Sequence, residues 1–254
     1  MVLDRFALTG KVAIVTGCST GLGESMAVGL AEAGADIAGV SSSEGPYKAG
    51  ELIEGLGGKF LQIRADLSSI LPIKDIVEKT LQTFGKIDIL VNNAGIIRRE
   101  DAINFSEKDW DDVMNVNVKS LFFLSQAVAR QFIKQGTGGK IINIASMLSF
   151  QGGIRVPSYT TSKSGVMGIT RLLANEWAKH DINVNAIAPG YMVTNNTQAL
   201  RNDPDRNREI LGRIPAGRWG LPEDLKGPVV FLASDASNYI NGYTVAVDGG
   251  WLAR

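Results

Sequence analysis

The amino-acid sequence predicts a single α/β domain in which helices cover both faces of a doubly wound, seven-stranded parallel sheet. Two observations lead to this prediction. Short runs rich in β-branched residues alternate with longer segments of helical hydrophobic period, an order typical of parallel strands joined by crossover helices. The run Ile87-Asp88-Ile89-Leu90-Val91 is almost continuously apolar, as is usual for a strand buried on both faces of a sheet.

Each expected element follows from this alternation. The β-branched runs predict strands at 12–15, 36–40, 60–65, 87–91, 140–145, 183–188 and 243–247. Apolar residues recur at helical spacing in the segments between them, which predicts helices at 22–33, 73–84, 110–134, 159–179 and 222–233. The region 190–215 is polar and has few signals of regular structure. We interpret it as a mobile segment that covers a ligand.

Composition limits the classes of function. The chain has 254 residues and is 44% hydrophobic, enough for one domain, 1–254, with a sizeable core. Its 26 basic and 26 acidic residues are dispersed, which argues against a nucleic-acid partner. No export signal or membrane-spanning run is visible, so we expect a cytoplasmic protein without a membrane partner. The chain has one cysteine, Cys18, and one histidine, His180, which argues against a disulfide within the chain or a metal site.

A glycine-rich turn, Thr16-Gly17-Cys18-Ser19-Thr20-Gly21-Leu22-Gly23, follows the first expected strand and precedes the first helix. Gly17 permits a tight turn, while Gly21 and Gly23 let the backbone approach a pyrophosphate at the helix N-terminus. We therefore expect a dinucleotide to contact this turn, including Ser19, Thr20 and Leu22.

Further candidate cofactor contacts lie at carboxyl ends of strands, where open parallel sheets bind ligands. They are Asp66, which can accept from an adenine amino group, with Leu67, and Asn93, Ala94 and Gly95. The second strand ends at Ser41-Ser42-Ser43, with Glu44 next. Since no cation is present there to neutralise a 2′-phosphate, we favour NAD over NADP.

A phenol, an ammonium and a hydroxyl form the candidate reaction centre. Tyr159 and Lys163 are four residues apart, and so lie on one helix face, with Ser146 thirteen residues upstream of Tyr159. For tyrosine to act as a base near neutrality, its pKa must fall by roughly 3 units, or about 4 kcal/mol. An ammonium about 4 Å away supplies a comparable energy at an effective dielectric near 20. These groups beside a dinucleotide indicate hydride transfer at a carbonyl carbon.

With these residues in view, the chain resembles the short-chain dehydrogenase/reductase family. The motifs span nearly the whole length: Thr16-Gly17-x-x-x-Gly21-x-Gly23, Asp66, Asn92-Asn93-Ala94-Gly95, Asn117, Ser146, Tyr159-x-x-x-Lys163 and Pro189-Gly190-x-x-x-Thr194. The resemblance implies a Rossmann-like fold, a nicotinamide cofactor and usually a homotetramer or dimer. It also implies that Asn117 holds a water chain to Lys163, that Lys163 grips ribose, and that the Pro189, Gly190 and Thr194 segment binds the cofactor.

The stretches 92–100, 145–159 and 215–220 resemble, more specifically, a sugar-acid subgroup. That likeness implies an anionic deoxy-hexonate substrate, oxidised at a secondary alcohol or formed from the ketone, in the bacterial breakdown of uronates. Arg99 and Arg155 are the candidate carboxylate ligands, together with Ser146 and Tyr159 at the reacting oxygen. Oxidation of gluconate at carbon 5 and NADPH-dependent reduction of a 3-oxoacyl thioester remain alternatives. A dinucleotide-binding protein without turnover is disfavoured because Ser146, Tyr159 and Lys163 are all present.

Overall fold

The computed structural model describes residues 1–254 and contains one seven-stranded parallel sheet. Its strands are β1 (Val12–Thr16), β2 (Asp36–Ser41), β3 (Phe60–Arg64), β4 (Ile89–Asn92), β5 (Gly139–Ile144), β6 (Ile182–Pro189) and β7 (Thr244–Val247). Their order in the sheet is β3-β2-β1-β4-β5-β6-β7. Because the strand order reverses between β1 and β4, a crevice opens at their carboxyl ends.

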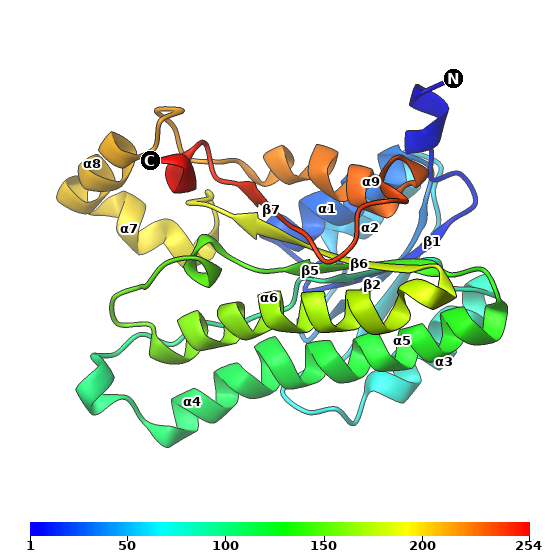
Figure 1. The fold of residues 1–254 in the computed structure, drawn as a ribbon, viewed down its shortest axis with the longest axis horizontal. Coiled ribbons are helices and arrows are strands. Elements are labelled where there is room, and N and C mark those ends of the chain that lie inside the picture. The colour runs from blue at the N-terminus through cyan, green and yellow to red at the C-terminus, as the bar shows by residue number, and fades with distance from the viewer.

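Helices cover both faces of the sheet (Figure 1). One layer contains α1 (Gly21–Glu32), α2 (Lys48–Gly55) and α9 (Lys226–Ala233); the other contains α3 (Ile73–Phe84), α4 (Glu107–Met114), α5 (Leu121–Gln135) and α6 (Pro157–Trp177). Each layer has its own buried cluster, with Met26 and Val229 in the first and Ile76, Phe132 and Leu173 in the second. The fold class predicted from the sequence is confirmed.

One predicted helix needs correction, and one helix was not predicted. The segment 110–134 begins earlier, at Glu107, and a π-helical turn, Asn115–Ser120, separates α4 from α5. Helix α2 was not predicted, because it has only eight residues and contains two glycines. Gly50 in this helix is needed for packing, since a Cβ there would lie 2.8 Å from the ring of Phe60.

The region 190–215 contains regular structure where the sequence predicted little. It forms α7 (Gln198–Asn202) and α8 (Pro204–Arg213), which lie beyond one end of the sheet (Figure 1). Asp203 begins α8 by accepting hydrogen bonds from the N–H groups of Asp205 and Arg206, and Pro204 occupies the first helical position. Both are ordinary helix-start signals.

No helix of the chain combines the length and apolar character needed to span a membrane. No three His, Cys, Asp or Glu side chains lie close enough together to ligate a metal ion.

Candidate active site

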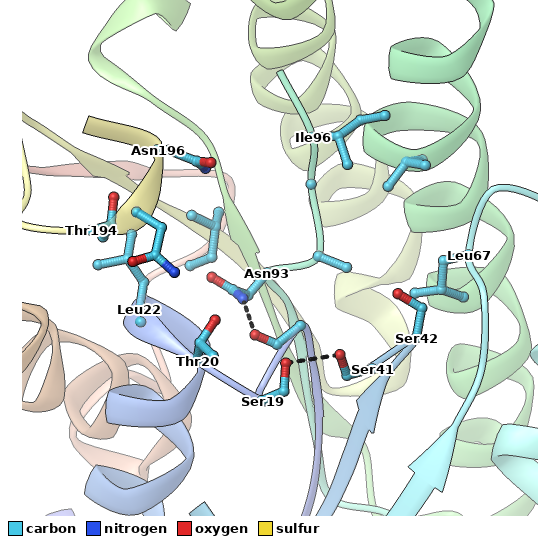
Figure 2. A pocket seen from close by; sticks show the side chains of 18 of the residues that line it. Ser19, Thr20, Leu22, Ser41, Ser42, Leu67, Asn93, Ile96, Thr194 and Asn196 are labelled. Atoms are coloured by element: carbon cyan, nitrogen blue, oxygen red, sulfur yellow. Dashed lines mark hydrogen bonds between the residues drawn. The ribbon is translucent and has the colours of Figure 1, made fainter. Parts of the chain in front are cut away.

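A cavity of about 670 Å³ lies at the carboxyl edge of the sheet. Its wall contains these candidate cofactor residues: Gly17, Ser19, Thr20, Gly21, Leu22, Gly23, Ser41, Ser42, Asp66, Leu67, Asn93, Ala94, Gly95, Tyr159, Lys163 and Thr194. Figure 2 shows Thr194 and Asn196 on one side of the cavity and Ser42 and Leu67 on the other. The structure thus brings together segments that are far apart in the sequence.

The glycine turn is compact on one side and open on the other. A Cβ on Gly23 would lie 2.1 Å from the carbonyl oxygen of Gly17, so this contact requires glycine. Gly21 has a φ of +61°, and only a methyl group of Thr194, at 3.8 Å, lies near its missing Cβ. The Thr20 side chain makes no capping hydrogen bond to α1. Open space beside an uncapped helix N-terminus fits the pyrophosphate of a dinucleotide.

Asn93 fastens this turn to the end of β4. Its side-chain amide donates to the carbonyl oxygens of Thr16 at 2.9 Å and Gly17 at 3.1 Å. In return, the Thr16 hydroxyl accepts from the backbone N–H groups of Asn93 and Ala94, both at 3.0 Å. The Asn93 side chain therefore shapes the cavity by fixing the turn.

Three hydroxyl groups gather where β2 ends. Ser19 Oγ lies 3.0 Å from both Ser41 Oγ and Ser43 Oγ, and the last two are 3.2 Å apart. Figure 2 shows the Ser19–Ser41 contact at the edge of the cavity. Nearby, Arg64 Nη2 donates to Glu44 Oε1 at 2.6 Å. The carboxylate thus neutralises the guanidinium beside this corner.

Part of the cavity wall is apolar and was not predicted. It includes Val40, Ala65, Ile96 and Val116, beside the predicted Asp66. The carboxylate of Asp66 accepts from the backbone N–H and hydroxyl of Ser68, both at 2.9 Å. Val40 and Ala65 could have been found, because each lies at the carboxyl end of a strand, directly before residues that were predicted to reach the crevice.

Tyr159 and Lys163 are placed by the first turns of α6, which begins at Pro157. Lys163 Nζ lies 5.6 Å from the centre of the Tyr159 ring and donates to the carbonyl oxygen of Ile144 at 2.6 Å. Burial lowers the pKa of Lys163 to about 8. Burial also raises the pKa of Tyr159, and contact with the Ser146 hydroxyl and the charge of Arg99 only partly oppose it. The chain's own groups therefore keep this phenol protonated near neutral pH.

That result differs from the expectation that Lys163 alone lowers the pKa of Tyr159. In the structure, Ser146 and Arg99 are the groups that act in this direction. The physical reason is that burial disfavours both the phenolate and the ammonium.

Two serines organise the start of the loop before α6. Ser146 Oγ accepts from the N–H of Leu148 at 3.1 Å. Ser149 is 8% exposed and donates to the carbonyl oxygen of Lys163 at 2.6 Å. Its hydroxyl also accepts from the N–H of Ser146 at 3.3 Å. Ser149 therefore links Ser146 to α6.

Asn117 lies in the π-helical turn and is 1% exposed. Its Oδ1 accepts from the N–H of Ile96 at 2.8 Å, and its Nδ2 donates to Ile96 O at 3.0 Å and to Ser162 Oγ at 3.1 Å. These contacts join the loop that follows Gly95 to α6. Such π-helical turns are frequent at functional sites.

The candidate arginines have different surroundings. Arg99 Nη2 donates to the carbonyl oxygen of Asn196 at 3.0 Å, and no carboxylate lies within ion-pair distance of it. Arg155 instead pairs with Asp101 at 3.0 Å and Glu100 at 3.8 Å. Neither lines the cavity wall, but Arg99 is close enough for its charge to act on Tyr159.

Pro189 ends β6 and Gly190 follows it, and both lie outside the cavity wall. Gly190 donates to the carbonyl oxygen of Val247 at 3.0 Å, and a Cβ there would lie 2.7 Å from Asp248 Cα. This pair of residues therefore packs against the segment after β7, while Thr194 faces the cavity.

Comparison with known proteins adds an independent observation. A family model described as enoyl-(acyl carrier protein) reductase matches residues 17–252. The chain is 73% identical to a 2-dehydro-3-deoxy-D-gluconate 5-dehydrogenase of Dickeya dadantii and 70% identical to one of Escherichia coli, in each case over 100% of both chains. A gluconate 5-dehydrogenase of Burkholderia cenocepacia, solved with NADP and tartrate, is 38% identical, covers 100% of both chains and superposes with a TM-score of 0.94.

Proposed function

The chain belongs to the short-chain dehydrogenase/reductase family of oxidoreductases, and from this we propose that it oxidises 2-dehydro-3-deoxy-D-gluconate at carbon 5. The observation that carries the substrate is the 73% identity to an enzyme of that name along both full chains. The cavity supports the chemistry, because it holds Tyr159 and Lys163 opposite the glycine turn.

The proposed roles follow from the geometry of the chain's own residues. A bound nicotinamide dinucleotide would accept the hydride from the substrate, or return it in reduction. Tyr159 takes the hydroxyl proton in oxidation and donates it in reduction, for which its protonated phenol is suited. Ser146 orients the reacting oxygen. Lys163 places a charge beside the phenol, and Asn117 holds the backbone at Ile96 in place.

We assign the substrate carboxylate to Arg99. A guanidinium can bind a carboxylate through two parallel hydrogen bonds, and Arg99 has no acidic partner of its own. Its charge already reaches Tyr159, so an acid bound there would have its other end near the reaction centre. Arg155 is a weaker candidate for this contact, because Asp101 and Glu100 occupy its guanidinium.

For the cofactor we propose NAD in preference to NADP. The support is that the corner formed by Ser19, Ser41 and Ser43 is uncharged, and that Glu44 neutralises the one nearby arginine, Arg64. A family member solved with NADP makes direct comparison of the two cofactors the necessary test.

Two further proposals concern the segment that covers the substrate and the number of subunits. We propose that the segment 190–215 covers the substrate, because Val193, Thr194, Asn195 and Asn196 line the cavity. We also propose a homotetramer. It is supported by β7, which is an edge strand of the sheet and needs protection from uncontrolled pairing. Light scattering after gel filtration measures the subunit number, and a monomeric mass would reject the assembly.

Neighbouring arginines provide the test of the carboxylate contact. We expect Arg99→Ala to raise KM for 2-dehydro-3-deoxy-D-gluconate by roughly 30-fold, as for loss of a charge-assisted hydrogen bond. Arg98→Ala is the matched control, since Arg98 pairs with Asp109 and Asp112 on α4. Equal KM values for the Arg99→Ala variant and the wild type would reject Arg99 as the carboxylate ligand.

A further inference from the structure

Two loops border the proposed substrate site, and one residue joins them. The loop after β4 carries Arg99, and the loop before α6 leads from Ser146 to Val156. Arg155 lies in the second loop, two residues before Pro157, where α6 begins. Its partners, Glu100 and Asp101, directly follow Arg99 in the first loop.

Arg155 contacts the first loop through both backbone and side chain. Its carbonyl oxygen accepts from the N–H of Glu100 at 3.1 Å. Its Nε lies 3.0 Å from Asp101 Oδ1, and its Nη2 lies 3.8 Å from Glu100 Oε1. Glu100 Oε1 in turn accepts from the N–H of Asp101 at 2.7 Å. We call this set of contacts the loop clasp.

The backbone of Arg155 is unusual as well. Its φ is +63°, and Asp181 is the only other non-glycine residue of the chain with a positive φ. Residues other than glycine rarely adopt a positive φ. They retain it where surrounding contacts enforce it. Glycine would fit this backbone without strain, yet an arginine that can reach Asp101 stands here. The contacts of its side chain and carbonyl oxygen therefore hold a conformation that glycine would adopt more readily.

We propose that Arg155 is a positioning residue: through the loop clasp it holds Arg99 at a fixed place relative to the start of α6. This inference rests on the proposed function, in which Arg99 binds the substrate carboxylate and Tyr159 acts at the other end of the substrate. An exposed ion pair contributes little to overall stability. Its effect here is to fix the distance between two substrate contacts, where small displacements strongly affect binding and rate.

The experiment compares Arg155→Ala with Arg155→Gly and Arg155→Lys in steady-state kinetics. Glycine accepts the positive φ and removes only the side chain, so it separates the clasp from backbone strain. We expect both Ala and Gly to raise KM for 2-dehydro-3-deoxy-D-gluconate by about tenfold, a size typical of coupled neighbours. Lysine, which can still pair with Asp101, should restore KM to within about twofold of wild type. Lys79→Ala, which breaks an exposed pair with Asp75 on α3, is the control and should match wild type.

A substrate analogue identifies the contact that the clasp serves. With the carboxamide of the same hexonate, which offers no carboxylate to Arg99, the Arg155 variants should have the KM of wild type. Adding Arg155→Ala to Arg99→Ala should raise KM for the acid no further. A tenfold effect on the carboxamide as well, or a wild-type KM in Arg155→Gly, would overturn the positioning role. If Arg99→Ala raises KM while Arg155→Ala and Arg155→Gly do not, only the positioning role of the loop clasp is rejected. If Arg99→Ala has no effect, the proposed carboxylate contact itself fails.

Discussion

At the residue scale, burial decides the properties of the reaction centre. Tyr159 and Lys163 are both held in a low-dielectric setting, which raises the pKa of the phenol and lowers that of the ammonium to about 8. Ser146 and Arg99 act against burial at Tyr159. The phenol thus remains a proton donor near neutrality, and in the proposed oxidation a bound oxidised nicotinamide would supply positive charge that favours its ionised form.

Removing the phenolic hydroxyl tests the acid/base role directly. We expect Tyr159→Phe to lower kcat by roughly a thousandfold, the usual size for loss of a general acid or base. The ring remains, so the dissociation constant of the cofactor, measured by fluorescence titration, should change little. Retention of most activity by this variant would contradict the assignment of Tyr159.

The Glu44–Arg64 pair provides a test of cofactor choice. In Glu44→Gln the guanidinium of Arg64 loses its carboxylate partner and can attract a 2′-phosphate. We expect kcat/KM with NADP, relative to NAD, to rise by about two- to fivefold, as for one exposed charge contact. The double variant Glu44→Gln/Arg64→Gln should lose this gain; a persistent gain would show that Arg64 is not involved.

At the scale of elements, the sequence predicted the strands better than the helices around the site. Buried parallel strands are nearly continuous apolar runs, so their positions and bounds can be read from the sequence. Helix α8 was missed because its surface is mostly polar and only Ile210 is buried. The π-helical turn at Asn117 depends on tertiary contacts with Ile96 and Ser162, which no local pattern reveals.

Some residues of the site could be predicted from the sequence and others could not. The glycine turn and the ends of β2, β3 and β4 follow from topology, and they line the cavity. The partner of Arg155 is Asp101, more than fifty positions away in the sequence. Nothing in the local sequence distinguishes a guanidinium that is already paired from one that remains available, as Arg99 does.

Helix α8 is anchored by a small apolar cluster that contains Met147, Ile210, Ile214, Trp219 and Trp251. Met147 directly follows Ser146, so the anchor links the proposed substrate cover to the reaction centre. We expect Ile210→Ala to weaken this docking by about 2–5 kcal/mol, which should raise KM and accelerate proteolysis within 198–213. Leu71→Ala, at a position 87% exposed, is the control. Unchanged proteolysis in Ile210→Ala would contradict the anchor.

At the scale of the whole molecule, the fold's stability should carry the signature of its buried lysine. Lys163 has a pKa of about 8 when folded and an ordinary value of 10.5. Below about pH 8 both the folded and unfolded chains hold this proton. Between about pH 8 and pH 10.5 the unfolded chain binds the extra proton, so this group makes the free energy of unfolding rise with pH.

The contribution of Lys163 to the pH dependence of the free energy of unfolding can be measured. The contribution is at most about 1.4 kcal/mol per pH unit. Urea unfolding at about pH 8 and pH 9.5, without added cofactor, should therefore show a rise in wild type that Lys163→Met reduces by up to roughly 2 kcal/mol. Lys140, whose pKa burial also lowers to about 8, contributes in the same direction and remains in the variant. An identical pH dependence in both proteins would contradict a lowered pKa at Lys163.

The measurement that tests the central claim most directly is the absorbance of reduced nicotinamide after purified protein is mixed with 2-dehydro-3-deoxy-D-gluconate. The assay is run once with NAD and once with NADP. Gluconate as substrate, and a 3-oxoacyl thioester with NADPH in the reducing direction, serve as comparisons. Our account predicts efficient NAD reduction with 2-dehydro-3-deoxy-D-gluconate, weak turnover of the other two compounds, and loss of turnover in Tyr159→Phe. Preferential NADPH oxidation by the thioester would contradict both the substrate and the cofactor that we propose.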